Sequence, residues 1–117
     1  MPHLILEASA NIIASNAKIK QTLNDCQNLL VAKLPTQLSN CKSRLILHDL
    51  FIVGDGNEQN AFIHLTVKIM KGRSQELLSE IAQKLKQILI NDFSKSSDHL
   101  NLASSVEIIE MNATYVN

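Results

Sequence analysis

Hydrophobic positions in the first 53 residues follow the order strand, helix, strand. Residues 2–8 alternate in polarity, with Leu4 and Leu6 on one side of the predicted strand. Residues 16–33 repeat apolar positions at steps of three and four, which predicts a helix with one buried face. Those apolar positions are Ile19, Leu23, Cys26 and Leu30. Residues 43–53, which are rich in Leu, Ile and Val, predict a second strand.

Residues near the predicted helix ends support its limits. Ser15 and Asn16 are both residue types that cap helix starts, and Pro35 cannot continue a helix. A polar loop with strong turn chemistry, residues 54–60, follows the second strand and is short enough to join antiparallel neighbours.

The second half repeats the order of the first half. Residues 61–69 have the clearest period of two in the chain, with Ala61, Ile63, Leu65, Val67 and Ile69 on one face. The turn at residues 71–73 leads to Ser74, a good N-cap. A helix is predicted over 75–93, and its apolar stripe contains Leu77, Ile81, Leu85, Ile88 and Leu89. A last strand is predicted over about 104–111, with Val106, Ile108 and Ile109.

Two similar β-α-β halves, about 2–53 and 61–111, therefore make one α/β (α+β) domain over residues 1–117. Each unit is expected to be right-handed with parallel strands, which gives a four-stranded mixed sheet with both helices on one face. Residues 43–53 are apolar on both sides, so we expect another subunit to cover the open face of the sheet.

Composition excludes several classes of function. The 11 basic and 11 acidic residues balance, whereas phosphate binding requires a basic surface, so nucleic acid is not an expected partner. Three Phe and one Tyr leave few rings for base stacking.

No apolar run approaches the ~20 residues of a membrane span, and the N-terminus lacks a signal-peptide pattern, so we expect a cytoplasmic protein. Cys26 and Cys41 are expected to be free thiols with packing roles.

Pro2 is a candidate reagent because methionine aminopeptidase removes Met1 when the second residue is small. Processing would leave a secondary amine at the start of the first strand, fixed at a sheet edge. An α-amine has an unperturbed pKa of about 7.7–8.0, and burial or nearby cations lower it further. Such an amine is a suitable general base near neutral pH.

Four segments occur in order along the chain: Met-Pro-His-Leu-Ile-Leu-Glu at the N-terminus, Ser43-Arg44, residues 61–69, and Gly72-Arg73-Ser74. Together they resemble the 5-carboxymethyl-2-hydroxymuconate isomerase family of the tautomerase superfamily. The resemblance extends from Pro2 to about Met111. It implies a tautomerase-like fold, a homotrimer, and an isomerase that ketonises a carboxymethyl-substituted 2-hydroxymuconate in homoprotocatechuate breakdown. It also implies that no metal and no organic cofactor is used.

Site residues follow from the resemblance position by position. Pro2 matches the catalytic amino-terminal proline, and Arg73 matches the arginine after the second-half strand. Arg44 matches the second arginine of the family's Arg-Ser-Arg segment, whereas Lys42 departs from the first. Lysine retains the charge but lacks the bidentate fork of a guanidinium, which puts substrate specificity in doubt.

The residue chemistry agrees with this assignment. Lys42, Arg44 and Arg73 supply three cations for a substrate with several carboxylates. Lys42 and Arg44 are two positions apart and share a strand face. Arg73 precedes a helix N-terminus, where backbone N–H groups also favour anions.

Other residues are weaker candidates. The four histidines show no metal-ligand spacing, although His48 shares a strand face with Arg44 and could reach a pocket. Cys41 has no histidine or acid placed to activate its thiol. Two alternatives stay open: a tautomerase of another enol substrate, which Lys42 favours, and a non-catalytic oligomeric binding module that retains Met1.

Overall fold

Four strands and two long helices make up the computed structural model, which describes residues 1–95 and 98–117. The elements follow one another as β1 (His3–Ser9), α1 (Asn16–Lys33), β2 (Lys42–His48), β3 (Asn60–Ile69), α2 (Gln75–Phe93) and β4 (Asn101–Glu110). One turn of 3-10 helix, η1 (Leu38–Asn40), lies between α1 and β2. Both helices have the limits that the sequence predicts, because Ser15 and Ser74 cap them through their hydroxyl groups.

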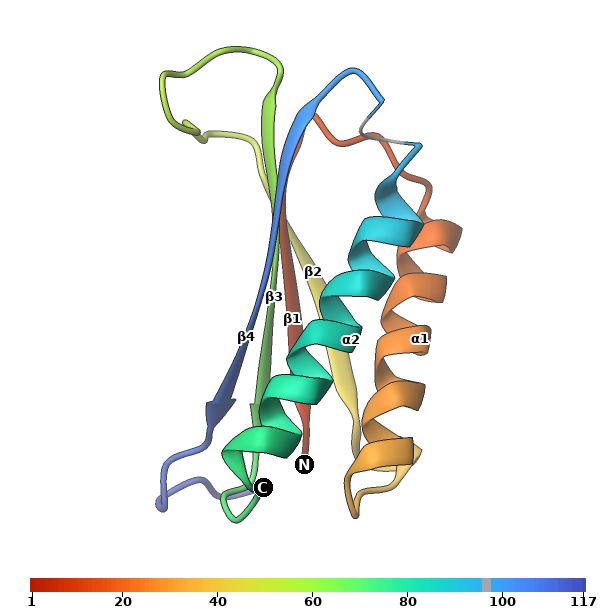
Figure 1. Ribbon diagram of the computed structural model, residues 1–117, viewed down its shortest axis with the longest axis vertical. Coiled ribbons are helices and arrows are strands. Elements are labelled where there is room, and N and C mark those ends of the chain that lie inside the picture. Colours follow the sequence, from red (N-terminus) through yellow and green to blue (C-terminus); the bar gives the residue numbers. More distant parts are fainter. Residues whose placement is uncertain (96–97) are drawn as a thin grey trace.

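The strands form one mixed sheet in the order β2-β1-β3-β4. Each β-α-β unit contributes a parallel pair, β1 with β2 and β3 with β4, and the two units meet through the antiparallel pair of β1 and β3. Both helices cover the same face of this sheet (Figure 1). The sequence prediction of a four-stranded mixed sheet with two helices on one face is confirmed.

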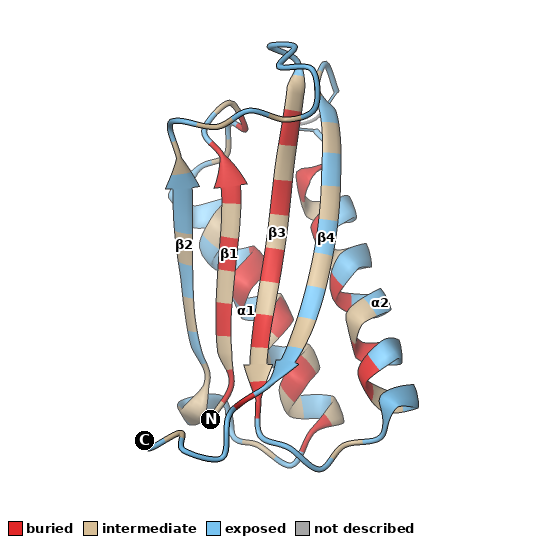
Figure 2. Ribbon diagram, turned by 90° about the vertical axis from the view of Figure 1, so that its left-hand side faces the viewer, coloured by how far each residue is buried: buried red, intermediate tan, exposed pale blue. Residues whose placement is uncertain are grey.

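The core lies between the sheet and the two helices. The side chains of β1 and β3 that point toward the helices are buried, and they alternate with half-buried positions (Figure 2). From the helices, the buried residues are Thr22, Leu23, Cys26, Leu30, Leu78, Ile81, Leu85, Leu89 and Phe93. Leu77 and Ile88, which the sequence places on the buried stripe of α2, lie half-buried at the margin of the core, and Leu78 takes the inner position.

The predicted strand over 43–53 is wrong at its C-terminal end. β2 pairs with β1, whose last residue, Ser9, lies opposite His48. Beyond that point no strand among the described residues pairs with it, and the chain continues into a loop in which Leu50 is 97% exposed. β4 begins earlier than predicted because β3 extends back to Asn60, which pairs with Asn101.

Both termini lie at one end of the molecule, together with the C-terminal end of α1 and the N-terminal end of α2 (Figure 1). The loops that lead from α1 to β2 and from β3 to α2 also lie at this end. In the described part of the chain, no helix has the length and apolar character needed to cross a membrane.

Candidate active site

Pro2 is buried at the end of the sheet where β1 begins and β3 ends. Its carbonyl oxygen accepts a hydrogen bond from the Lys42 N–H at 3.0 Å, which ties the start of β1 to β2. A cavity of about 290 Å³ opens beside it. The residues that line it are Met1, Pro2, Leu34, Pro35, Thr36, Gln37, Asn40, Ile69, Met70 and Arg73. While Met1 is attached, the Pro2 nitrogen is an amide without basicity.

Arg73 reaches this cavity from the turn between β3 and α2. Gly72 makes the turn possible, because its φ of 116° lies in a region that side chains rarely adopt, and its N–H donates to the Glu110 carboxylate at 3.2 Å. Ser74 then caps α2 by accepting a hydrogen bond from the Leu77 N–H at 3.2 Å. Arg73 is half-buried and makes no salt bridge within the described ranges. Its guanidinium is therefore available to an anion.

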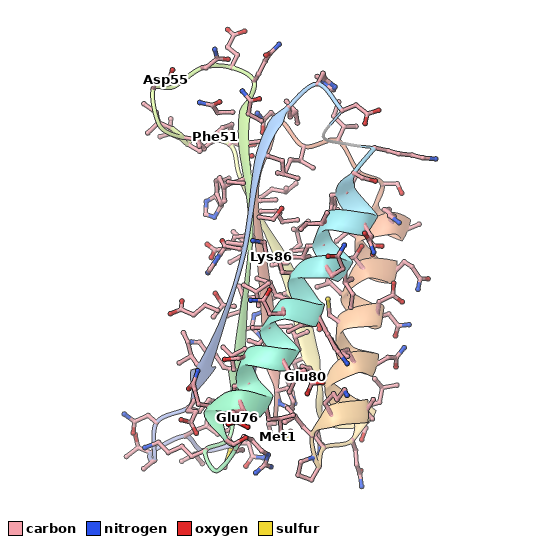
Figure 3. The ribbon with its side chains drawn as sticks, viewed as in Figure 1. Met1, Phe51, Asp55, Glu76, Glu80 and Lys86 are labelled. Carbon is pink, nitrogen blue, oxygen red and sulfur yellow. The ribbon has the colours of Figure 1, made fainter. Side chains whose placement is uncertain are left out.

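The amino terminus and the start of α2 lie at the same end of the molecule. Met1 and Glu76, which belongs to the first turn of α2, both lie at this end (Figure 3). The cavity lining includes both Pro2 and Arg73, which are far apart in sequence. The fold thus brings together two of the four residues that the sequence singles out.

Within a single protomer, Arg44 and Lys42 lie outside the Pro2 cavity. Arg44 lines a second, more open hollow of about 710 Å³ on the sheet face that the helices leave uncovered. Its Nη1 donates to His3 Nδ1 at 3.0 Å, and His3 Nε2 lies 2.9 Å from the Tyr115 hydroxyl. Lys42 is exposed next to His3 in the sheet and lines neither hollow. Both side chains lie on the sheet face that the helices leave uncovered, because Lys42 and Arg44 alternate with Leu45, which packs against the core.

The hydrogen bonds of His3, which lines this second hollow, define its protonation state. A guanidinium donates and never accepts, so His3 Nδ1 must be the acceptor and Nε2 carries the proton. The pKa of the imidazole is lowered below 6.5, first by burial and then by the positive charges of Arg44 and Lys42. His3 is accordingly a neutral, structural bridge between β2 and the C-terminal segment.

His48 and His64 form hydrogen bonds within the sheet. His48 Nε2 lies 3.0 Å from Glu7 Oε1, and His64 Nδ1 lies 2.7 Å from the Ser105 hydroxyl. Neither residue lines the Pro2 cavity. Across residues 1–95 and 98–117, no group of three or more His, Cys, Asp or Glu residues is arranged to hold a metal ion.

Both cysteines are free thiols. Burial raises the pKa of Cys26 to about 12. Burial also raises the pKa of Cys41, although the nearby amino terminus and Lys42 oppose that effect. Neither thiol is thereby activated as a nucleophile.

Three polar lining residues escaped the sequence analysis: Thr36, Gln37 and Asn40. They lie in the connection from α1 to β2. Because β1 and β2 are parallel, this connection must return the chain to the end where β1 begins, beside Pro2. The predicted order strand, helix, strand was therefore enough to place this connection beside Pro2, although no sequence motif marks its residues.

Comparison with known proteins identifies the family of the chain. The family model described as 5-carboxymethyl-2-hydroxymuconate isomerase matches residues 2–117. The 5-carboxymethyl-2-hydroxymuconate Delta-isomerase of Escherichia coli is 31% identical over 114 residues, covering 97% of this chain and 90% of the relative. A crystal structure of a 5-carboxymethyl-2-hydroxymuconate isomerase from Deinococcus radiodurans R1 is similar with a TM-score of 0.85 and 27% identity, covering 99% of this chain and 88% of the other.

A more distant structure shares the fold alone. It is described as a fused 4-OT wild-type symmetric trimer, and it superimposes with a TM-score of 0.70 at 14% identity, over 97% of this chain and 89% of the other. The family is one of enzymes, as the sequence predicts. With a model match over nearly the whole length and a relative above 30% identity, the chain belongs to the 5-carboxymethyl-2-hydroxymuconate isomerase family.

Proposed function

We propose that this isomerase uses the amine of Pro2, freed by loss of Met1, as the general base and acid that ketonises a carboxylated 2-hydroxydienoate. A substrate such as 5-carboxymethyl-2-hydroxymuconate fits the family, and the corresponding role is in homoprotocatechuate degradation. The observation that carries the proposal is the shared cavity of Pro2 and Arg73, which joins a basic nitrogen and an uncommitted cation.

The chemistry requires no exchange of electrons with another molecule. The amine nitrogen takes the proton of the 2-hydroxyl group, and the electron pair shifts along the conjugated double bonds. The protonated amine then returns a proton to a carbon of the chain, so the product is an isomer of the substrate. An amine with a pKa at or below about 7.7–8.0 can do both steps near neutral pH.

Arg73 is proposed to hold a substrate carboxylate and to stabilise the dienolate that forms between the two proton transfers. It precedes the N-terminal end of α2, where free backbone N–H groups add to the positive potential.

We propose that Arg44 and Lys42 bind substrate carboxylates from a neighbouring subunit of a homotrimer. Both are exposed on β2 and lie outside the Pro2 cavity of their own protomer. A structure with this fold is a symmetric trimer. Self-association is also supported by exposed apolar residues on β2 and in the loop after it, since Ile46 is 44% and Ile52 is 78% exposed.

One observation favours a second substrate class for the same chemistry. Within a protomer the cavity contains a single cation, Arg73, and its other polar side chains are uncharged. An enol acid with fewer carboxylates, such as phenylenolpyruvate, therefore becomes the alternative substrate. Relative turnover of the two enols separates these possibilities.

The experiment begins with untagged protein, whose intact mass reports whether Met1 is gone. Ketonisation of 2-hydroxymuconate and of phenylenolpyruvate is then followed by ultraviolet absorbance. We expect a form that retains Met1, made by inserting a bulky residue after it, to lose about 10²–10⁴-fold in kcat, the usual contribution of a general base. Pro2→Ala and Arg73→Ala are also expected to lose activity, and Lys20→Ala on the exposed side of α1 serves as the control.

Absence of turnover above solvent by processed protein on both enols would reject the proposal. It would favour a non-catalytic oligomeric binding module instead. Equal activity with and without Met1 would reject the amine as the base while leaving the isomerase activity in place.

A further inference from the structure

We propose that Tyr115 and His3 are positioning residues for Arg44, and that they hold its guanidinium in the orientation in which it binds a substrate carboxylate. This inference rests on the proposed function, which assigns to Arg44 a substrate carboxylate in a neighbouring subunit. It adds two side chains that act on the substrate only through Arg44, and it gives the C-terminal segment, residues 111–117, a role in substrate recognition.

The three side chains form a chain of two hydrogen bonds that runs in one direction. Arg44 Nη1 donates to His3 Nδ1 at 3.0 Å, and His3 Nε2 lies 2.9 Å from the Tyr115 hydroxyl. Since a guanidinium only donates, Nδ1 is an acceptor, the proton of the neutral imidazole lies on Nε2, and the hydroxyl accepts it. Tyr115 therefore favours the one tautomer of His3 whose Nδ1 can accept from Arg44.

Tyr115 is itself held in place by the C-terminal segment that follows β4. The Met111 N–H donates to the Ile69 carbonyl at 2.7 Å, and Met111 is buried, so the segment leaves the sheet at a fixed point. A turn then forms, because the Tyr115 N–H donates to the Asn112 carbonyl at 3.0 Å. The Tyr115 ring packs edge-on against His3, with ring centroids 5.8 Å apart and an interplanar angle of 77°. The hydroxyl is thus in place before any ligand arrives.

Arg44 depends on this chain for its orientation. It is exposed, it forms no salt bridge within the described ranges, and among the described residues His3 alone accepts a hydrogen bond from its side chain. A long exposed side chain loses conformational freedom when it binds a ligand, and a hydrogen bond formed beforehand reduces that loss. Because His3 uses only Nη1, the other N–H groups of the fork are available to a carboxylate.

A neutral partner suits this task better than a charged one. A carboxylate at the position of His3 would also accept from Arg44, but it would compete with the substrate for the positive charge. Burial, and then the charges of Arg44 and Lys42, lower the pKa of His3 below 6.5, so the imidazole is neutral at pH 7. His3 can therefore orient the guanidinium and leave its full charge to the ligand.

The first test measures the order of the Arg44 side chain in the ligand-free protein. NMR relaxation of its Nε–H group gives an order parameter, which falls when the group moves on the ps–ns timescale. We expect Tyr115→Phe, which removes only the hydroxyl group, to lower this order parameter to below about 0.6, the flexible range. Val116→Ala is the matched control, since Val116 lies in the same segment and is 89% exposed. An unchanged order parameter in Tyr115→Phe would overturn the inference.

The second test compares the binding of two dienoates by calorimetry, on protein whose Met1 has been removed. Muconate has a carboxylate at each end and sorbate has only one, so only muconate needs a second cation besides Arg73. We expect Tyr115→Phe to weaken muconate binding about fivefold, the effect of one hydrogen bond, and to leave sorbate binding unchanged. Arg44→Ala should weaken muconate binding at least about tenfold, and adding Tyr115→Phe to it should cause no further loss.

The outcomes separate this inference from the proposed function. Weaker binding of both ligands by Tyr115→Phe would indicate a purely structural role and overturn the inference. A muconate affinity that falls in Arg44→Ala but not in Tyr115→Phe would also overturn it, while leaving Arg44 as a carboxylate ligand. A muconate affinity that Arg44→Ala leaves unchanged, or no binding of muconate by the unmodified chain, would reject the proposed role of Arg44 and this inference with it. The expected binding pattern in protein without isomerase activity would reject the proposed function and leave this inference intact.

Discussion

His3 shows how a single residue next to the candidate base depends on its neighbours. It accepts from Arg44 through Nδ1 and contacts Tyr115 through Nε2, so protonation of Nδ1 would place two donors face to face. Desolvation and the cations Arg44 and Lys42 all disfavour the charged imidazole. The bond to Arg44 therefore exists only while His3 is neutral.

A pH titration follows from this arrangement. Because the folded-state pKa of His3 lies below 6.5, the unfolded chain binds the proton first as the pH falls. His3 thus reduces stability as the pH drops below its unfolded value of about 6.5 and has no such effect at higher pH. We expect the NMR-detected pKa of His3 to lie below 6.5 and to rise in Arg44→Ala. Lys20→Ala should leave it unchanged, and a His3 pKa above 6.5 would contradict the assignment.

The candidate site could be predicted from sequence only where a residue has a distinctive role. Pro2 and Arg73 stand out because one carries a potential amine and the other precedes a helix start, and the fold places both in one cavity. Arg44 and Lys42 carry the right charge, but which cavity a charge faces depends on the sheet edge and on assembly. Gln37 and Asn40 have no motif, and only the geometry of the loop brings them to the cavity.

At the scale of elements, the helices were more predictable than the strands. Helix limits are set locally by the caps at Ser15 and Ser74, which need no distant partner. Strand limits are set by the neighbouring strand: β2 stops where β1 stops, although the sequence remains apolar as far as Val53. The residue at which such pairing ends cannot be predicted from the sequence of the strand itself.

The cap of α1 can be tested without touching the site, since Ser15 lies at the other end of the helix. Its hydroxyl accepts a hydrogen bond from the Lys18 N–H at 3.1 Å. We expect Ser15→Ala to lower the free energy of unfolding by about 1 kcal/mol. Ser15→Asp should retain it, because the carboxylate also caps and no acidic residue occupies the first turn. Thermal unfolding of both variants measures the effect, and equal stability of Ser15→Ala and the unmodified chain would refute it.

For the whole molecule, the central question is what covers the open face of the sheet. Only one side of β1 and β3 is buried by the helices, and the apolar residues at the end of β2 and in the loop beyond it have no cover in one protomer. Ile46, on the open face of β2, is 44% exposed, and Leu50 and Ile52 in the loop beyond it are 97% and 78% exposed. A protomer of 13.0 kDa with this much exposed apolar surface is expected to associate.

The mass in solution tests this expectation. We predict by light scattering a species of about three times the 13.0 kDa protomer, as the proposed homotrimer requires. Leu50→Lys combined with Ile52→Lys should shift the mass toward the protomer, because three copies would each bury two charges without partners. Ile90→Lys is the matched control, since Ile90 is 41% exposed on α2, which covers the opposite face of the sheet. If Arg44 and Lys42 act across the interface, dissociation should also reduce turnover while each protomer keeps its fold by circular dichroism. A trimer that survives the double lysine variant would show that the loop after β2 lies outside the interface.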